Sequence, residues 1–314
     1  MNPKERLEQY AGEVESVIRA WLPPEDGYQR TVAMAMNYSV KAGGKRLRPL
    51  FMREVYRLFA GAPGQGEENR EKGKSGQSAG PEAAVEPFMA AIEMIHTFSL
   101  IHDDLPCMDN DSLRRGQPTT WVKYGYDMAV LAGDGLAICA FETAARALEV
   151  SDRPEAVARC MGLLARKSGV EGMIGGQTVD VELSGKPIDP QRLDFIYRLK
   201  TGALLEVSMM IGAILGGADD SQVEAVEKMA SLVGQAFQIQ DDILDLTGTT
   251  EVLGKPVLSD EKNEKTTYVS LYGMEKAREA VRDLSAQAKE LLWSLPGDHD
   301  FLEYLMDMLI TREK

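Results

Sequence analysis

Apolar residues recur every three or four positions along most of the chain, which is the spacing of one face of an α-helix. The pattern predicts helices over residues 4–21, 28–42, 48–60, 83–103, 127–148, 153–168, 190–217, 221–245 and 274–293. Alternating β-branched segments, which are typical of strands, are nearly absent, and no repeat of solenoid period occurs. The chain is therefore predicted to be all-α, with many helices around one core.

A polar, glycine-rich stretch interrupts this pattern after residue 60. Residues 61–80 contain six glycines, mixed charges and no aliphatic side chain larger than alanine. This composition is typical of a surface loop, and also of a linker between domains. The 60 residues before it would make a poor domain alone. We therefore expect a single domain over residues 1–314, with a flexible insertion at 61–82.

Composition and charge narrow the class of protein. The net charge of −14 and the pI near 4.8 argue against a nucleic-acid-binding protein. No stretch approaches the roughly 20 apolar residues that span a bilayer, and the first 22 residues contain no apolar signal core. The three cysteines are too few and wrongly spaced for a disulfide framework or a zinc site. These features favour a cytoplasmic protein with reduced thiols and no membrane span.

The sequence "SLIHDDLPCMDND", at residues 99–111, places four aspartates directly after an apolar helical segment. Asp103 and Asp104 are expected to end that helix, because Pro106 cannot continue it. In a regular helix Asp103 and Asp109 would lie about 240° apart, so the proline bend is what could turn Asp109 back. Converging carboxylates without histidine or thiolate suit a hard cation, Mg²⁺ before Zn²⁺.

A second acidic cluster, "FQIQDDILD", occupies residues 237–245 and also follows an apolar run. Asp241 and Asp242 lie four and three residues before Asp245, so all three can share one helix face. Gln238 precedes them by one turn. A single acidic cluster is most often a solvated helix face. Two such clusters, each at the end of an apolar helix, favour a metal site instead.

Basic motifs accompany the two aspartate clusters. Mg²⁺ in proteins commonly binds through a few carboxylates together with substrate phosphates, so phosphate-binding cations are expected nearby. The candidates are Lys45, Arg46 and Arg48 in "GGKRLRP", Arg114 and Arg115 in "LRRG", Lys200 in "LKTG" and Lys255 in "GKP". Arginine can bind phosphate bidentately, whereas lysine acts as a movable point charge. Each motif alone would be weak evidence for a phosphate site, but their combination with two aspartate clusters indicates a diphosphate-binding enzyme.

In these motifs the chain resembles the short-chain trans-isoprenyl diphosphate synthases, also called polyprenyl synthetases, and among them the bacterial farnesyl diphosphate synthases. The resemblance runs from "GGKRLRP" through "IHTFSLIHDDLPCMDNDSLRRGQPT", "LAGDGL", "GGQTVDVE" and "LKTGALLE" to "GQAFQIQDDILD" and "EKTTY". It implies an all-α, single-domain isoprenoid synthase fold around a central cavity. It also implies a homodimer that binds isopentenyl diphosphate and an allylic diphosphate.

The resemblance assigns a role to each site residue. The Mg²⁺ ligands that it implies, for three ions per active site, are Asp103, Asp104, Asp109, Asp241, Asp242 and Asp245. The contacts to isopentenyl diphosphate are Lys45, Arg48, His96 and Arg115, and those to the allylic diphosphate are Arg114, Lys200 and Lys255. Thr201 and Gln238, which with Lys200 form the catalytic set, would place oxygens near the developing allylic cation. Gln177 and Asp180, three residues apart on another helix, are expected to face the same cavity.

The chemistry implied by the resemblance is ionisation of the allylic diphosphate, attack by the isopentenyl double bond and loss of a proton. Phe98, beside Ser99 one turn before Asp103, resembles the aromatic floor that stops growth at fifteen carbons. The expected product is therefore farnesyl diphosphate, and the alternative within the family is geranylgeranyl diphosphate. A core phenylalanine without any gating role is the other interpretation of Phe98.

Two other classes of protein compete with this interpretation. A terpene cyclase also uses Mg²⁺ and an aspartate motif, but it ionises one substrate and needs no second diphosphate pocket. The "GGKRLRP" motif, Arg115 and the second cluster argue against it. A non-catalytic subunit of a heterodimeric synthase tends to lose one aspartate motif, and here both are intact.

Overall fold

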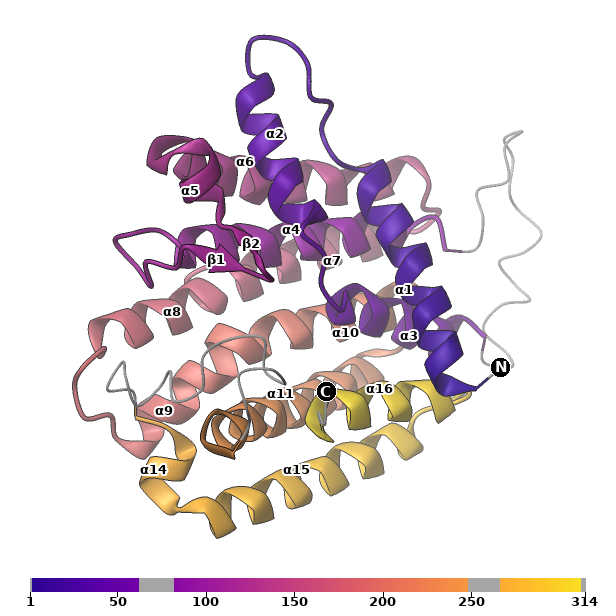
Figure 1. The fold of residues 1–314 in the computed structure, drawn as a ribbon. Coiled ribbons are helices and arrows are strands. Elements are labelled where there is room, and N and C mark those ends of the chain that lie inside the picture. Colours follow the sequence, from indigo (N-terminus) through magenta and orange to yellow (C-terminus); the bar gives the residue numbers. More distant parts are fainter. Residues whose placement is uncertain (1, 62–81, 248–265, 312–314) are drawn as a thin grey trace. The chain divides into compact units, whose positions relative to one another are not determined.

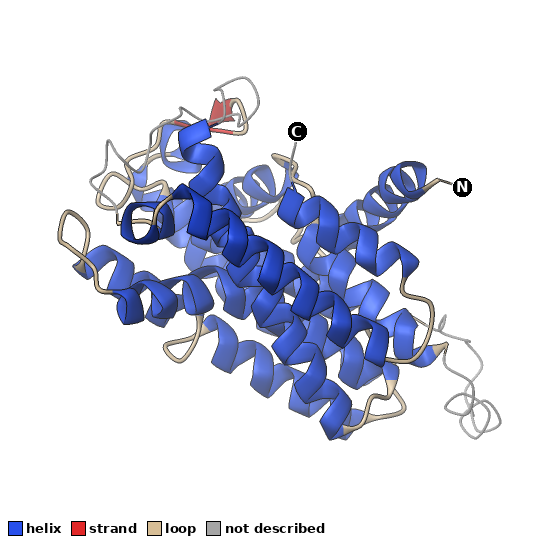
Figure 2. Ribbon diagram, turned by 90° about the horizontal axis from the view of Figure 1, so that it is seen from below, coloured by secondary structure: helices blue, strands red, loops and turns tan. Residues whose placement is uncertain are grey.

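The protein is described here from a computed structural model that covers residues 2–61, 82–247 and 266–311. Helices account for nearly all of these residues, as Figure 2 shows, so the all-α prediction is confirmed. The strands found among the described residues are the two-residue β1 (Leu113–Arg114) and β2 (Gln117–Pro118). They pair antiparallel, with Leu113 opposite Pro118.

The chain divides into two compact units. The first consists of the described residues of Met1–Arg53 and Gly73–Gly162, and the second of those of Glu54–Lys72 and Leu163–Lys314. Helices α3 (Leu47–Ala60) and α7 (Pro154–Ser168) contribute residues to both. That the chain is one domain stays a prediction. The predicted insertion at 61–82 lies outside the described residues, apart from its two end positions.

Helix α4 (Glu86–Asp103) is the core of the first unit, because residues on nearly all of its sides are buried. It packs against α6 (Tyr126–Ala145), α1 (Pro3–Ala20) and α2 (Arg30–Lys41) (Figure 1). The close approach of α6 depends on Gly133, where a Cβ atom would lie 2.1 Å from His102 Nε2. The short α5 (Thr120–Tyr124) and the 3₁₀ turn η1 (Arg146–Glu149) complete the unit.

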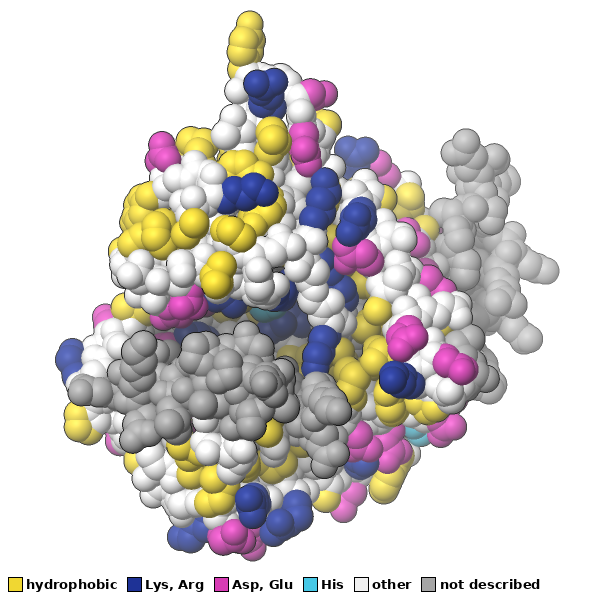
Figure 3. All heavy atoms as spheres, in the orientation of Figure 1, with side chains coloured by type: hydrophobic (Ala, Val, Ile, Leu, Met, Phe, Trp, Pro, Cys, Tyr) yellow, Lys and Arg dark blue, Asp and Glu magenta, His cyan; other side chains and the backbone are white. Residues whose placement is uncertain are grey.

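Successive side chains of the strand pair lie on opposite faces, as expected for extended backbone. Leu113 is 63% exposed, whereas the next residue, Arg114, is half-buried. Figure 3 shows hydrophobic side chains on the surface over α5 and these strands, where Val122 is also exposed. The hairpin therefore turns Arg114 inward and leaves Leu113 on the surface.

The second unit is built on the apolar helix α10 (Ala203–Gly216) and the long α11 (Asp220–Thr247), which pack against each other. Helix α11 also packs along α15 (Met274–Ser294) and contacts α16 (Asp300–Thr311) (Figure 1). The remaining elements are α8 (Met173–Glu182), α9 (Pro190–Ile196), a π-helical turn η2 (Tyr197–Gly202) and α14 (Tyr268–Tyr272). Helices α9 and α10 form one run in which the π turn is inserted.

Each predicted helix exists, and most ends lie within three residues of the predicted ones. Helices α5, α8, α14 and α16 were not among the predicted ranges. The five residues of α5 and of α14 are too few to show a helical period, and the glycine pair in α8 lowers helix propensity.

The expectation that no segment has enough apolar residues to span a bilayer was too strict. Tyr126–Glu149 and Pro190–Gly216 are long and apolar enough by length and composition alone. The second is 78% buried inside the protein, as a core helix would be, and the first is 39% buried. Such helices occur in the cores of proteins that never meet a membrane, so they are weak indicators of a span.

Candidate active site

The first aspartate cluster follows the end of α4 in a tight turn. Asp103 is the last residue of the helix, and Asp104 caps it. The backbone N of Asp109 donates to the carbonyl of Asp103 at 2.9 Å, and that of Asn110 donates to Leu105 at 3.1 Å. The chain after Pro106 therefore turns back to the helix end, as the proline predicted.

Asp104 and Arg114 form a bidentate ion pair in the first unit. Arg114 Nε lies 2.8 Å from Oδ1 and 2.9 Å from Oδ2 of Asp104, and Nη2 lies 2.5 Å from Oδ1. Asp104 is only 3% exposed. Burial raises the pKa of its carboxyl above the ordinary value, and the hydrogen bonds from Arg114 oppose that rise. Asp104 was predicted as a metal ligand, and in this structure both of its oxygens accept bonds from Arg114.

His96 lies on α4 among the arginines predicted to bind isopentenyl diphosphate. Burial, reinforced by the charges of Arg48, Arg115 and Arg114, holds the pKa of His96 well below its ordinary value. The imidazole is therefore neutral at physiological pH and can donate one N–H without adding charge. The structure thus brings three of the four predicted contacts, His96, Arg48 and Arg115, into one electrostatic environment.

The loop "GGKR" passes close to Arg115. Arg115 Nη1 donates to the carbonyl of Gly43, and a Cβ atom on Gly44 would lie 2.9 Å from the Arg115 guanidinium. Gly44 has a φ of +137°, which L-residues rarely adopt. The second glycine therefore permits both the conformation of the loop and its contact with Arg115. Lys45, the next residue, is exposed.

The π turn of the second unit carries Lys200 and Thr201. Lys200 Nζ lies 2.6 Å from Asp180 Oδ2, and Thr201 Oγ1 donates to Gln238 Oε1 at 2.9 Å. The structure thus joins the predicted catalytic residues Thr201 and Gln238 directly, and it links Lys200 to α8. A π turn inside an α-helix is frequent at functional sites, because it displaces side chains from their regular positions.

These residues border a cavity of about 100 Å³ within the second unit. Its walls include Asp180, Lys200, Thr201, Gln238 and Asp242. The expectation that Asp180 faces the same cavity as the catalytic residues agrees with this lining. Gln177, predicted beside Asp180, lies on the same helix but does not line this cavity.

The aspartates of the second cluster differ in their surroundings. Asp241 is half-buried, whereas Asp242 and Asp245 are 4% and 2% exposed. Asp242 Oδ2 accepts hydrogen bonds from Tyr197 Oη at 2.5 Å and from the backbone N of Tyr268 at 2.7 Å. Asp242 therefore holds the start of α14 to α11.

Tyr197 is a site residue that the sequence interpretation missed. It stands three residues before Lys200 in the π turn, lines the same cavity and bonds Asp242. Its place one turn before a predicted catalytic lysine was the available signal. A buried tyrosine hydroxyl needs a hydrogen-bonding partner, and that partner is not apparent from the spacing along the chain.

The donor atoms of the two clusters fit Mg²⁺ in chemistry, since they are all carboxylate oxygens. Within residues 2–61, 82–247 and 266–311, no three His, Cys, Asp or Glu side chains converge as a ready-made metal site. Mg²⁺ in proteins commonly keeps several waters and takes one or two carboxylates together with substrate phosphates. The assignment of all six aspartates as ligands stays a prediction: Asp103, Asp104, Asp109, Asp241, Asp242 and Asp245. Lys255 lies outside the described residues.

Phe98 and Ser99, the predicted chain-length residues, stand in the last turns of α4. Phe98 is 9% exposed, and its ring meets that of His102 edge to face at 5.9 Å. Ser99 Oγ donates to the carbonyl of His96 at 2.8 Å. Ser99 is thus tied to the turn that carries the neutral histidine. The role of both residues in product length stays a prediction.

Known proteins resemble this chain along almost its whole length. Residues 29–293 match the polyprenyl synthetase family. A farnesyl diphosphate synthase of Geobacillus stearothermophilus is 38% identical over 311 residues, which cover 98% of each chain. A chloroplastic geranylgeranyl pyrophosphate synthase of Catharanthus roseus is 44% identical over 260 residues, 82% of this chain and 67% of that protein.

A solved structure is similar in fold. The geranyltransferase of Helicobacter pylori, complexed with magnesium and isoprenyl diphosphate, matches with a TM-score of 0.79 and 27% identity. The match covers 99% of this chain and 97% of that one. Together with the helices described above, it confirms the predicted isoprenoid synthase fold. The two relatives are named for products of different length.

Proposed function

This chain belongs to the polyprenyl synthetase family of prenyltransferases, and we propose that it condenses isopentenyl diphosphate head to tail with dimethylallyl or geranyl diphosphate. The proposed product is (2E,6E)-farnesyl diphosphate, released with diphosphate. Mg²⁺ is the proposed cofactor, with three ions per active site. The full-length likeness to a farnesyl diphosphate synthase supports the fifteen-carbon product, and the geranylgeranyl diphosphate synthase among the relatives supports the alternative.

The observation that carries the condensation is the contact of Arg115 with the glycine-rich loop, in which the Gly43 carbonyl accepts from the guanidinium. Arg115, Arg48 and the neutral His96 belong to a unit separate from the one that holds Lys200 and the second aspartate cluster. A condensation needs two diphosphate sites, whereas a terpene cyclase needs one. The two groups of cations supply one for each substrate. Arginine pairs of this kind bind phosphate oxygens through charge-assisted hydrogen bonds.

The proposed roles follow from the charge that develops in the reaction. Breaking the allylic C–O bond leaves a diphosphate anion, which Lys200, Arg114 and Lys255 would stabilise electrostatically. Thr201 Oγ1 donates its proton to Gln238 Oε1, so its lone pairs are left to face the allylic cation. Bound Mg²⁺ would neutralise further charge on the leaving group. The isopentenyl double bond then attacks the cation, and a proton passes to the departing diphosphate.

One experiment separates this function from its alternatives. The protein is incubated with Mg²⁺, isopentenyl diphosphate and dimethylallyl, geranyl or farnesyl diphosphate, and the products are analysed by mass. We expect fifteen-carbon product from the first two starters. A twenty-carbon product would indicate a geranylgeranyl diphosphate synthase. Hydrocarbon released from the allylic diphosphate alone would indicate a terpene cyclase. The absence of turnover in every mixture would indicate a non-catalytic subunit.

Phe98→Ala is expected to lengthen the product to twenty carbons or more, because it removes the ring proposed to end the hydrocarbon site. Product mass measures this change directly. The control is Phe88→Ala, which truncates a fully buried ring of the same helix. Each variant should lose about 3–5 kcal/mol of folding free energy, as usual for a buried phenylalanine. If both variants still make only fifteen-carbon product, Phe98 is not the floor.

A homodimer is the proposed assembly, and the surface of α6 supports it. Leu131 and Ile138 are 49% and 71% exposed and lie seven residues apart, on one side of the helix. The opposite side, with Ala132 and Leu136, is buried in the first unit. Light scattering should give twice the chain mass of 34.5 kDa, and Ile138→Glu should give the single mass. Val122→Glu, at an exposed apolar residue of α5, is the control and should stay dimeric.

A further inference from the structure

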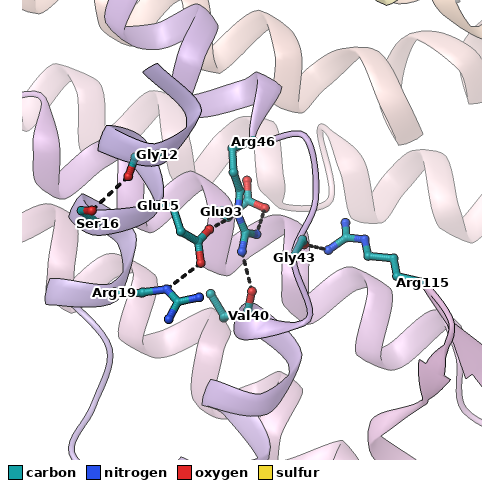
Figure 4. A network of polar contacts seen from close by, with 9 residues as sticks. All are labelled: Gly12, Glu15, Ser16, Arg19, Val40, Gly43, Arg46, Glu93 and Arg115. Atoms are coloured by element: carbon teal, nitrogen blue, oxygen red, sulfur yellow. Dashed lines mark hydrogen bonds and ion pairs between the residues drawn. The ribbon is translucent and has the colours of Figure 1, made fainter. Parts of the chain in front are cut away.

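Arg46 belongs to the glycine-rich loop, yet its guanidinium is buried inside the first unit. The side chain is held by three acceptors from three helices (Figure 4). Nε donates to Glu15 Oε2 at 2.7 Å and Nη1 to Glu93 Oε1 at 2.6 Å. Nη2 donates to the carbonyl of Val40 at 2.5 Å. Arg46 is 3% exposed and Glu93 2%, so this is a buried charge cluster.

The charge balance of the cluster separates Arg46 from the other cations of the loop. Burial alone would lower the pKa of Arg46, and the carboxylates of Glu93 and Glu15 more than offset that effect. Glu93 and Glu15 therefore neutralise the Arg46 guanidinium, and Glu15 also accepts from Arg19 Nε at 2.7 Å. Lys45 and Arg48 are the other cations of this segment, and they are the ones predicted to contact isopentenyl diphosphate.

The backbone at Arg46 shows that the loop is constrained here. Its φ of +49° lies in the left-handed region, which a non-glycine residue adopts only at a cost. Such a conformation persists where the surrounding contacts over-determine it. The three bonds of the guanidinium provide those contacts, because they fix the side chain to α1, α4 and the end of α2.

We propose that Arg46, Glu15 and Glu93 form a positioning triad for the isopentenyl diphosphate site. The inference rests on the proposed function. Glu93 stands one turn before His96 on α4, and Arg46 stands between Lys45 and Arg48 in the chain. The same loop receives the Arg115 hydrogen bond at Gly43 (Figure 4). The triad thus connects the segments that carry the four predicted contacts of that site, which are His96, Lys45, Arg48 and Arg115.

A role in stability alone would not explain the triad. Replacing a buried charge cluster with apolar residues of similar volume is often neutral or stabilising. Positional control is different, because an apolar cluster has no directional bonds with which to hold a strained loop. A stabilising role and a positioning role therefore predict different results when the charged residues are replaced with apolar ones.

Steady-state kinetics of Arg46→Met test the proposal. We expect KM for isopentenyl diphosphate to rise about tenfold, with KM for geranyl diphosphate changed less than about twofold. The matched control is Arg53→Met. Arg53 is equally buried, donates to Glu13 of α1 at 2.9 Å and lies over the Tyr10 ring at 4.2 Å. It should lower the melting temperature and leave both KM values unchanged.

Two further variants keep the test decisive if Arg46→Met does not fold. Arg46→Lys keeps the charge but cannot reach three acceptors, and we expect an intermediate rise in the KM for isopentenyl diphosphate. The triple variant Glu15→Leu/Arg46→Met/Glu93→Leu supplies an apolar cluster in place of the triad. We expect it to fold and still to show the tenfold rise. A triple variant with wild-type KM would overturn the positioning role.

Other outcomes are equally clear. Equal rises in both KM values, or the same rise in Arg53→Met, would show a general loss of structure and sink the inference. If the wild-type protein does not condense the substrates at all, the proposed function fails. Calorimetric binding of inorganic diphosphate then tests the triad by itself. Weaker binding to Arg46→Met than to Arg53→Met supports it, and equal binding refutes it.

Discussion

Gly176→Ala is expected to lower kcat of the condensation about a hundredfold. Gly176 lies on α8 against the π turn, and a Cβ atom there would stand 2.2 Å from the backbone N of Lys200. Backbone cannot yield as the end of a flexible side chain can. The π turn must shift, and Lys200 and Thr201 shift with it. Misplacing catalytic groups by about 1 Å costs about this factor in rate.

Helix propensity alone would predict that Gly176→Ala stabilises the protein. Alanine in place of glycine within a helix stabilises by about 1 kcal/mol. At Gly176 the collision with the backbone of residues 199 and 200 is larger than that gain. Gly162→Ala is the control, because this exposed helical glycine has no atom within 4 Å of the added methyl. It should keep wild-type kcat and gain slightly in melting temperature. A fully active Gly176→Ala enzyme would show that the π turn does not set the catalytic geometry.

Asp241→Asn is expected to reduce kcat about a thousandfold and to raise the Mg²⁺ concentration needed for half-maximal activity. Asp241 is the half-buried carboxylate of the second cluster, and a hard cation binds an amide oxygen much more weakly than a carboxylate. Kinetic titration with Mg²⁺ measures both effects. Calorimetry of Mg²⁺-dependent diphosphate binding checks the metal role without turnover.

The neighbouring Asp242→Asn is the matched control for Asp241→Asn. Asp242 is buried and bonded to Tyr197 and to the backbone of Tyr268. An asparagine keeps one oxygen that can accept from these donors, so the loss in kcat should be nearer tenfold. The Mg²⁺ requirement should remain as in the wild type. The reverse order, with Asp242→Asn the more metal-dependent variant, would move the ligand role to Asp242.

Much of the fold was predictable because helical periodicity is a local property of the sequence. Helix α4 is an example, since its last turn and the turn-back at Asp109 followed from an apolar run and one proline. The π turn was not predictable in this way. The run 190–217 has the period of one continuous helix, and its irregular turn lies against Gly176 and Gly234, which are distant in sequence.

For the residues of the site, too, local sequence predicted some features, whereas others depend on tertiary contacts. Motif spacing identified the cations and carboxylates, but it could not tell which of them bind a partner inside the protein. Arg46 was grouped with the phosphate-binding cations, and its three nitrogens instead serve Glu15, Glu93 and Val40. The two carboxylate partners stand 31 and 47 residues from Arg46. Contacts at that separation follow from tertiary structure and leave no periodic trace.

The π turn also has a consequence for how the gene can change. A π turn contains one residue more than an α-helical turn. Deleting a single codon within residues 197–202 would remove the bulge and restore a regular helix, while α9 and α10 on either side keep their phase. The change would fall on the turn itself, where Tyr197, Lys200 and Thr201 are spaced to reach Asp242, Asp180 and Gln238. The number of residues in this segment is therefore as much a part of the site as the side chains that it carries.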